Sequence, residues 1–341
     1  MSKYSKFVVS PISFLIDSNS LVLRMLGRSM FPFRSDIEAL SLRLLGGNDL
    51  CVEKGRPVVG SRRSLVSRGR SAVRRYFISR KGNPHVSVIM AAHKAESTIS
   101  ESIESLLNQA YPFFALIIVI DGDVDGTLKI CRDYARRDNR ITIMVNAENR
   151  GVAYSRNRAL AVAKTRFVTF NDADDISSPY RLDTQLHALL RRKGKVVSSS
   201  LYVRVDESLE PYCVDGKLLR KCMASIMMDW DRVKKAAGYL LEIPVGEDSE
   251  YYRRIKLVFG EECEIFVVRC LYYALYREGS LNFCGRTIIR KTRKGVSLEK
   301  SSDAVRIEGF VGRVHRAIIS GHLDGRVDRV CQGAFLKYLE R

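Results

Sequence analysis

Short apolar runs alternate with amphipathic stretches through the middle of the chain. The apolar runs, rich in the β-branched side chains of buried parallel strands, are residues 86–90, 115–120, 141–145 and 167–170. The stretches between them, with apolar side chains at helical spacing, are residues 96–109, 127–136 and 153–164. This alternation predicts an α/β fold, in which a mostly parallel sheet carries helices on both faces.

The composition of the chain changes at Pro84, from basic and polar to apolar. We expect three segments. We expect residues 1–81 to form a basic N-terminal extension and linker, because residues 60–81 are rich in Arg, Ser and Gly. Residues 82–290 are expected to form the α/β domain, and residues 291–341 a helical C-terminal tail. No run reaches the ~20 apolar residues of a membrane-spanning helix. The first apolar patch is too interrupted for a cleaved secretory signal.

Basic residues dominate the N-terminal extension. The formal net charge is +19, and residues 1–81 contain 16 Lys and Arg against 5 Asp and Glu. Residues 54–81 contain ten basic residues and no acidic one. Such a run attracts polyanions, either nucleic acid or the anionic cytoplasmic leaflet of a membrane. The alternative is a solvated extension without a partner.

The eight cysteines are spread along the chain without a CxxC pair or the spacing of zinc ligands. We therefore expect free thiols rather than disulfides or a structural zinc site. Free thiols persist in a reducing compartment, so this usage favours a cytoplasmic location.

Polar residues stand just past the ends of three predicted strands. They are His93, Asp121 and Asp174. In parallel sheets, ligands bind beyond the carboxyl ends of the strands. The fold therefore predicts that these scattered residues converge on one site.

The sequence from Asp172 to Asp175 carries three carboxylates within four residues. They repel one another unless a cation or a proton relieves the charge. Mg²⁺ and Mn²⁺ favour one or two carboxylates together with phosphate oxygens. The loop therefore predicts a divalent-cation site, and the alternative is an acidic turn that caps the next helix.

Three further segments carry possible chemistry. Asp121, Asp123 and Asp125 alternate in a turn without EF-hand spacing, which favours capping of the next helix over calcium binding. The helix that begins near residue 151 offers free backbone N–H groups and Arg156 to a phosphate. Acids at residues 247–250 would either cap a helix or supply a general base.

Taken together, these segments resemble the family 2 glycosyltransferases, which have the GT-A fold. The resemblance covers roughly residues 84–281. Residues 120–127 are similar to the family's Asp-Asp-Gly-Ser-x-Asp-Gly-Thr, with Ile120 in place of the first Asp. The other segments that resemble motifs of the family are residues 86–94, 149–157, 172–175, 246–254 and 271–281. The Gln-x-x-Arg-Trp signature of processive members is absent.

The resemblance implies a role for each matching residue. Asp174 falls on the metal ligand, which makes Mn²⁺ or Mg²⁺ the expected cofactor. Asp248 falls on the catalytic base, with Glu247 beside it, and Arg254 falls on the acceptor side. The residues expected to contact the nucleotide-sugar are Ala91, His93, Asp121, Arg156, Asp172 and Asp175.

The expected activity is therefore that of an inverting, metal-dependent, non-processive hexosyltransferase. The donor would be a nucleotide-diphospho-sugar, with a UDP-sugar as the first choice, and the acceptor a glycan or lipid-linked hydroxyl, as in polysaccharide biosynthesis. Residues 54–81 would hold the cytoplasmic enzyme on the inner face of the plasma membrane. The location of the basic residues outside the sheet domain argues against nucleic acid as a partner.

Three alternatives stay open at this point. A sugar nucleotidyltransferase shares the nucleotide-binding topology and the acidic metal site, but such enzymes more often begin with a glycine-rich loop, which residues 91–94 lack. A basic nucleic-acid-binding protein would account for the charge. A glycosyltransferase-like fold without activity would account for Ile120 and His93, whereas the presence of Asp174, Glu247 and Asp248 argues against it.

Overall fold

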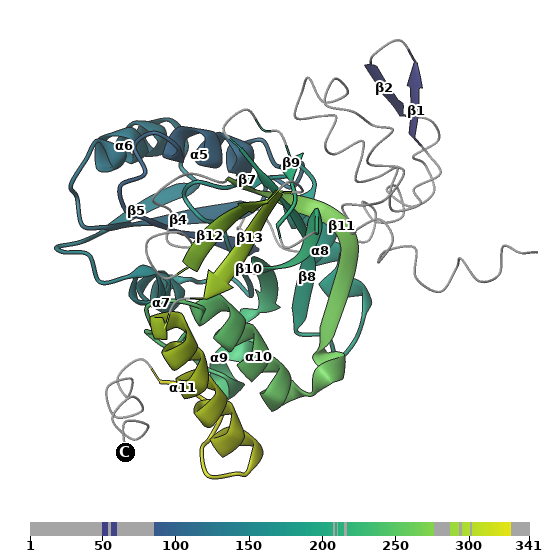
Figure 1. Cartoon of the computed structure of the whole chain (residues 1–341). Coiled ribbons are helices and arrows are strands. Elements are labelled where there is room, and N and C mark those ends of the chain that lie inside the picture. Colours follow the sequence, from purple (N-terminus) through teal and green to yellow (C-terminus); the bar gives the residue numbers. More distant parts are fainter. Residues whose placement is uncertain are drawn as a thin grey trace, which may run out of the picture.

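A computed structural model describes most of the α/β domain and part of the chain beyond its C-terminal end (Figure 1). The described residues are 85–275 apart from 207–208, 210 and 215–216, then 302–328, and the backbone of four short strands. Those strands are β1 (Leu50–Glu53), β2 (Arg56–Val59), β12 (Thr287–Thr292) and β13 (Gly295–Lys300). Apart from β2, the basic segment 54–81 lies outside the described residues, as do the interrupted patch near the N-terminus and Cys331.

The four predicted strands form one parallel half of the central sheet. They are β3 (Val86–Ala92), β4 (Phe114–Asp121), β5 (Ile141–Asn146) and β6 (Phe167–Phe170). Their order in the sheet is β5-β4-β3-β6, and every neighbouring pair is parallel. Because the strands are parallel, the carboxyl ends of β3, β4 and β6 lie at one edge of the sheet. This arrangement confirms the α/β fold that the alternation predicts.

Beyond β6 the sheet continues through strands that run in both directions. Its order continues β6-β10-β8-β11-β7, with β9 beside β8. β10 is antiparallel to β6 and β8, whereas β11 is parallel to β8. The bounds are β7 (Ile176–Ser177), β8 (Val197–Val205), β9 (Pro211–Tyr212), β10 (Leu219–Asp229) and β11 (Glu264–Leu275). This half carries β11 past the acidic loop that comes after β6.

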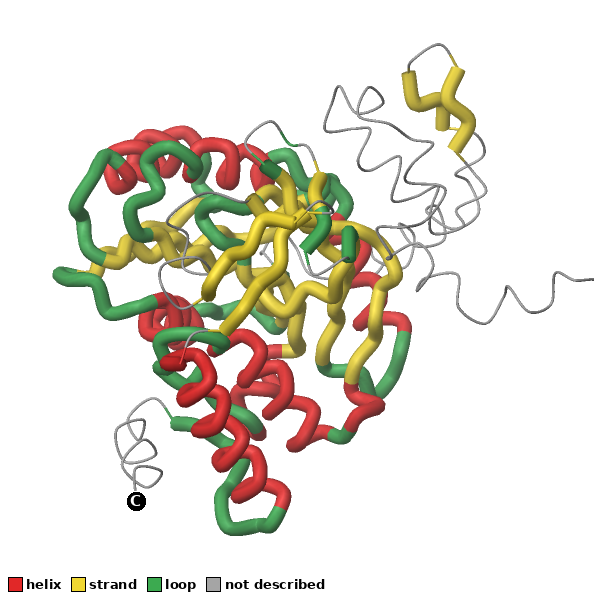
Figure 2. Tube along the Cα trace, viewed as in Figure 1, coloured by secondary structure: helices red, strands yellow, loops and turns green. Residues whose placement is uncertain are grey.

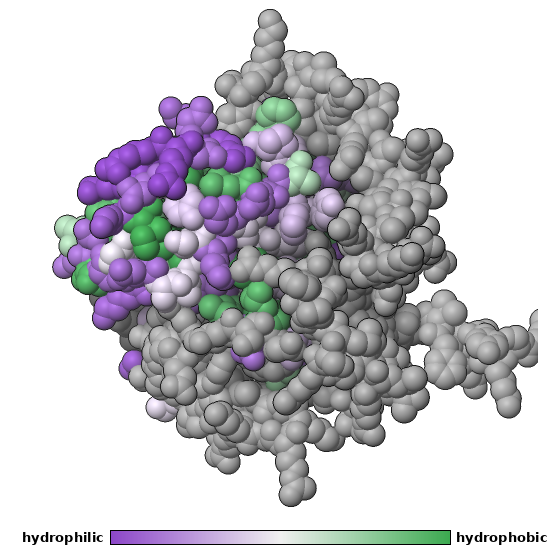
Figure 3. Space-filling view, turned by 90° about the horizontal axis from the view of Figure 1, so that it is seen from above, coloured by the Kyte–Doolittle hydropathy of each residue, from purple (hydrophilic) through white to green (hydrophobic). Residues whose placement is uncertain are grey.

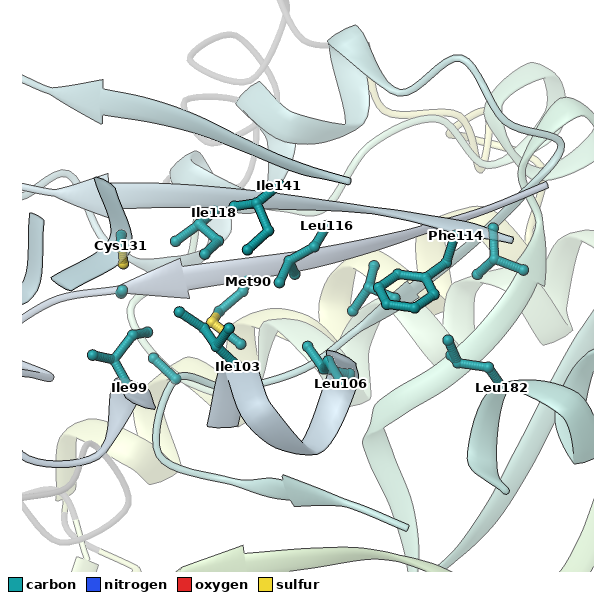
Figure 4. Close-up of a cluster of buried hydrophobic side chains, with 14 of the residues drawn as sticks. Met90, Ile99, Ile103, Leu106, Phe114, Leu116, Ile118, Cys131, Ile141 and Leu182 are labelled. Atoms are coloured by element: carbon teal, nitrogen blue, oxygen red, sulfur yellow. The ribbon is translucent and has the colours of Figure 1, made fainter. Parts of the chain in front are cut away.

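Helices cover both faces of the sheet (Figure 2). On one face, α5 (Ile99–Leu107), α6 (Thr127–Arg137) and α8 (Arg181–Arg191) share an apolar core with Val88 and Met90 of β3 (Figure 4). On the other face, α7 (Val152–Val162), α9 (Trp230–Ala236) and α10 (Glu247–Phe259) pack around Ile89. Successive residues of β3 point to opposite faces, so the apolar residues Val88, Ile89 and Met90 contribute to both cores.

The C-terminal helix α11 (Ser302–Ile319) lies against α10, and its Val311 and Val314 pack in an apolar cluster with Leu241 and Ile243. After α11, Val327 forms an isolated parallel β-bridge with Gly238. Gly238 has φ +69°, and a Cβ there would lie 2.1 Å from the Val327 carbonyl oxygen, so only glycine fits. The boundary at residue 290 and the helical tail over 291–341 stay predictions.

Two expected features concern the whole described chain. The cysteines at positions 131, 213, 222, 263 and 270 are all free thiols. None of the helices in the described ranges combines the length and the apolarity that crossing a bilayer requires.

Viewed from above, the described surface is mixed in polarity (Figure 3). Hydrophilic residues cover much of it, and hydrophobic ones appear between them in smaller groups.

Candidate active site

The acidic loop comes directly after β6 and is folded into a tight turn. The Asp175 N–H donates to the Asp172 carbonyl over 3.2 Å. Two hydroxyls of the neighbouring α5 region donate to the same turn, Ser102 to the Asp172 carbonyl at 2.9 Å and Thr98 to the Ala173 carbonyl at 3.2 Å. The polar side chains of α5 thus fix the loop backbone.

The carboxylates of this loop differ in their surroundings. The Asp172 side chain is 34% exposed, whereas Asp175 is buried and its Oδ1 accepts the Leu275 N–H at 2.9 Å. Burial raises the pKa of Asp175 well above its ordinary value, and the charges of Asp174 and Asp172 raise it further. The repulsion expected from the sequence is therefore present in the folded loop.

Arg156 joins this loop to a motif 75 positions further along the chain. Its Nη2 donates to Asp172 Oδ1 at 2.5 Å, and its Nη1 donates to Glu247 Oε1 at 2.9 Å. The side chain is 2% exposed and lies over the Phe170 ring, 5.0 Å from its centroid. Burial opposes its charge, but Asp172, Glu247 and Asp248 outweigh this and raise the pKa of Arg156 above its ordinary value.

Glu247 and Asp248 form the first turn of α10. The preceding Gly246 has φ +77°, a conformation that glycine adopts without strain and that starts the helix here. Burial raises the pKa of Glu247 to about 7, although Arg156 opposes the shift. Asp248 is half-buried, and its Oδ1 accepts the Ser249 N–H at 2.6 Å. The two acids therefore lie close to Arg156, and their catalytic roles stay predictions.

Asp121, at the end of β4, orders the loop that leads into α7. Its Oδ1 accepts from Asn146 Nδ2 at 2.7 Å and from the Arg150 N–H at 2.9 Å, and its Oδ2 accepts the Gly151 N–H at 2.8 Å. His93 Nδ1 lies 2.6 Å from the Asp121 carbonyl oxygen. Ala91 is half-buried in β3 beside Val119 of β4. These residues share one edge of the sheet, as predicted.

Arg254 lies in a different network. It is fully buried, and its Nε donates to Glu250 Oε1 at 2.7 Å. Its Nη groups donate to the carbonyls of Ala237, Tyr239 and Gly325. The structure thus gives Arg254 a role in holding α10 to the C-terminal residues, and its acceptor-side role stays a prediction.

Asp125 was predicted correctly from the sequence, whereas Tyr272 was missed. The Thr127 N–H donates to Asp125 Oδ1 at 3.0 Å, so Asp125 serves the start of α6, as expected for a turn without calcium-loop spacing. Tyr272 was not expected in the site: it is buried, and its Oη accepts the Asp172 N–H at 2.9 Å. Its place in residues 271–281, the segment similar to the end of the family's domain, was the available signal.

The acidic loop has the donor atoms that a divalent cation prefers. Within the described ranges, no group of three or more His, Cys, Asp and Glu side chains is arranged to hold a metal ion. Mg²⁺ and Mn²⁺ need fewer protein ligands, because one or two carboxylates and the phosphates of a substrate complete their coordination. The oxygen donors of Asp172 and Asp174, together with the repulsion at Asp175, fit such a cation.

Comparison with known proteins bears on the same residues. Residues 87–227 match the model described as glycosyl transferase family 2. The chain is 34% identical to the putative glycosyltransferase EpsE of Bacillus subtilis over 167 residues, 46% of this chain and 60% of EpsE. It is 31% identical over 158 residues to the UDP-Glc:alpha-D-GlcNAc-diphosphoundecaprenol beta-1,3-glucosyltransferase WfaP of Escherichia coli, 44% of this chain and 62% of WfaP.

Among solved structures, the S. aureus protein TarS in complex with UDP-GlcNAc matches with a TM-score of 0.49 and 23% identity. That match covers 57% of this chain and 59% of that one. The chain spans less than two thirds of the length of EpsE, WfaP and TarS.

Proposed function

We propose that the chain, whose residues 87–227 match the model described as glycosyl transferase family 2, transfers a hexosyl group from a nucleotide-diphospho-sugar to an acceptor hydroxyl. One observation carries the proposal. Arg156 contacts both Asp172, in the loop after β6, and Glu247, at the start of α10. These contacts support one site that joins the proposed donor-side and acceptor-side motifs, although 75 positions separate Asp172 from Glu247 in the sequence.

The charges of this site suit a diphosphate leaving group that is bound with a cation. Asp172, Glu247 and Asp248 surround Arg156, so the site has an excess of acid. Asp174, with Asp172 beside it, would hold Mn²⁺ or Mg²⁺, which when bound supplies the positive charge that a leaving diphosphate needs. Arg156 orients Asp172 and thereby the nucleotide side of the site.

Asp248 is the proposed general base. It is half-buried at the start of α10, adjacent to Glu247, whose carboxylate Arg156 holds in place. A carboxylate in this position takes the proton of the acceptor hydroxyl as that oxygen attacks the anomeric carbon. Attack from the face opposite the leaving diphosphate is a single displacement, which inverts the anomeric centre.

The names of relatives support a choice of donor and acceptor. WfaP is named for transfer from UDP-Glc to a sugar on diphosphoundecaprenol. TuaG of Bacillus subtilis, 38% identical over 109 residues, is named for teichuronic acid biosynthesis. We therefore propose a UDP-sugar donor and a lipid-linked or glycan acceptor, and a place on the cytoplasmic membrane surface where such an acceptor is presented.

Equilibrium binding tests this proposal without knowledge of the acceptor. Calorimetric titration of UDP, GDP and dTDP into the full chain with Mn²⁺ should give binding of UDP above the other two. Excess EDTA should abolish that binding. The proposal is wrong if none of the three nucleotides binds, or if EDTA leaves their affinity unchanged.

A further inference from the structure

Arg181, the first residue of α8, is a buried cation behind the acidic loop. Its side chain is fully buried, and its partners are neutral. Nε donates to Ser177 Oγ at 2.7 Å, and Nη1 donates to Thr169 Oγ1 at 2.9 Å. Within the part of the chain that the structure describes, no carboxylate pairs with it. Burial lowers the pKa of Arg181 to about 10, which leaves it charged at neutral pH.

A buried charge without a counter-ion costs stability, and polar hydrogen-bond partners reduce that cost. Asn171 is one of these partners, and it links Arg181 to the loop. Asn171 is 1% exposed, and its Oδ1 accepts from Arg181 Nη2 at 3.3 Å and from Ser177 Oγ at 2.6 Å. These two donors fix which end of the amide is oxygen. The amide nitrogen is thereby turned toward the loop.

The amide nitrogen of Asn171 holds both ends of the acidic turn. Nδ2 lies 2.9 Å from the Asp172 carbonyl oxygen and 3.2 Å from the Asp175 carbonyl oxygen. An aspartate in place of Asn171 could not donate to either carbonyl, although it would have the same shape. The chain of contacts thus runs from Arg181 through Asn171 to the backbone that presents the three carboxylates.

Tyr272 makes a second link between Arg181 and the loop. The Arg181 guanidinium lies 5.8 Å from the centroid of the Tyr272 ring, and the Tyr272 Oη accepts the Asp172 N–H. Arg156 contacts the side chain of Asp172, whereas Arg181 supports the backbone of the loop through its partners.

We propose that Arg181 is a positioning residue for the acidic loop. Acting through Asn171 and Tyr272, it fixes the backbone of residues 172–175. Arg181 itself touches no substrate. Its effect on the loop does not depend on the proposed function, whereas its effect on donor binding does.

Hydrogen exchange of the full chain tests the effect on the loop. We compare wild type with Arg181→Lys, which keeps the charge but loses the planar fork, and with Ser177→Ala, which removes the hydroxyl shared by Arg181 and Asn171. Peptides that cover residues 171–177 should exchange about fivefold to tenfold faster in both variants, the change expected when about one hydrogen bond is lost. Peptides from β3 and β4 should exchange as in wild type.

Arg254→Lys is the matched control, because Arg254 is also fully buried and bonded to backbone carbonyls, but in a different network. It should lower stability without a local change in residues 171–177. Unchanged exchange of the loop in Arg181→Lys and Ser177→Ala would overturn the proposal, as would a uniform rise over the whole chain. If Arg181→Lys does not fold, the exchange of Ser177→Ala decides alone.

Binding of UDP with Mn²⁺ provides the second measurement. Both variants should bind UDP about tenfold more weakly than wild type, as expected when a partner behind the ligands is lost. Failure of wild type to bind UDP would overturn the proposed function and leave the exchange result standing. Local loosening of the loop with an unchanged UDP affinity would overturn the link between Arg181 and donor binding.

Discussion

Arg156 is the residue that connects the two acidic segments of the candidate site. The two terminal nitrogens of its guanidinium donate to Glu247 and Asp172, which lie far apart in the sequence. Around it stand Asp172, Glu247 and Asp248, whose charges raise its pKa. A site with more acids than bases is suited to binding a cation, and this leads to a prediction at Asp174.

Asp174→Asn should reduce turnover by ~100-fold or more, because even outer-shell partners of a metal ligand change metal affinity or activity by ~10–100-fold. The fold should be kept, since the substitution removes a charge that repels Asp175. Turnover and thermal unfolding measure the two effects. Asp123→Asn, in the exposed acidic turn before α6, is the matched control and should behave as wild type. Equal activity of the two variants would count against Asp174 as a ligand.

Asp248→Asn should lose transfer while keeping affinity for UDP with Mn²⁺. A positioned base contributes typically ~10²-fold or more to the rate, and the proposed donor contacts are made by other residues than Asp248. Initial rates and calorimetry measure the two quantities. Glu262→Gln, whose side chain is fully exposed, is the control for loss of one negative charge. A rate above about a tenth of wild type would remove Asp248 from this role.

The spacing of the motifs predicted which acids belong to the site, but not which side chains they contact. Asp172 and Glu247 both contact Arg156, which the motifs placed only near the nucleotide. Arg254 stands six positions after Asp248, yet it faces the opposite network, because a helix turns its residues through all directions within two turns. The partners Tyr272, Asn171 and Arg181 are set by packing across strands, which a single sequence does not reveal.

Helix α10 joins the site to the C-terminal residues. Its first turn carries Glu247, Asp248 and Glu250, and Glu250 pairs with Arg254 one turn later. His315 of α11 places Nε2 3.3 Å from Glu250 Oε1. Glu250 is therefore the acid that couples α11 to the helix that presents the proposed base.

The pairing of Glu250 predicts a pH-dependent stability. Burial opposes its charge, but Arg254 and His315 lower the pKa of Glu250 below its ordinary value. A lowered carboxyl pKa contributes stability above the pKa of the unfolded chain, and this is lost as the pH falls through the folded pKa. Glu250→Gln should cost about 3–5 kcal/mol at pH 7, because it leaves Arg254 buried without its acid.

The cost of Glu250→Gln should shrink as the pH falls below ~4.5, where the unfolded carboxyl becomes neutral. Urea unfolding of both proteins between pH 3 and pH 7 measures this. Glu261→Gln, whose acid is exposed next to Lys256, is the control. A difference in stability that stays constant across this range would contradict the assigned ion pair.

Among the elements, the parallel strands could be predicted and the antiparallel ones could not. Strands β3, β4, β5 and β6 are buried on both faces or alternate with helices, so their apolar runs and spacing stand out. β8 contains Ser198, Ser199 and Ser200, which are all buried but read as polar. β10 changes register between Cys222 and Met227, which breaks its alternation. Burial of polar residues in the sheet therefore conceals this half.

Over the whole molecule, residues 1–81 contribute +11 (16 basic minus 5 acidic residues) of the net charge of +19, outside the sheet domain. Each basic residue near an anionic membrane contributes ~1 kcal/mol, and physiological salt screens it within ~8 Å. If half of the ten basic residues of 54–81 reach the lipid, they contribute roughly 5 kcal/mol of binding. This segment lies outside the described residues apart from β2, so its role stays a prediction.

Vesicle co-sedimentation tests the membrane contact. The full chain should sediment with anionic vesicles and not with neutral ones, and high salt should release it. A full-length variant with the ten basic residues of 54–81 replaced by glutamine should not sediment with either. Replacing Arg306, Arg313 and Arg316 of α11 in the same way is the control, and a loss of sedimentation there instead would move the contact to α11.

Turnover of a nucleotide-sugar tests the function most directly. UDP-, GDP- and dTDP-sugars are incubated with the full chain in Mn²⁺, with and without excess EDTA, and the nucleotide product is identified. We predict release of UDP from a UDP-sugar that stops in EDTA. Release of no nucleoside diphosphate from any donor would contradict glycosyl transfer, as would formation of pyrophosphate from UTP and a sugar phosphate, the reaction of a nucleotidyltransferase.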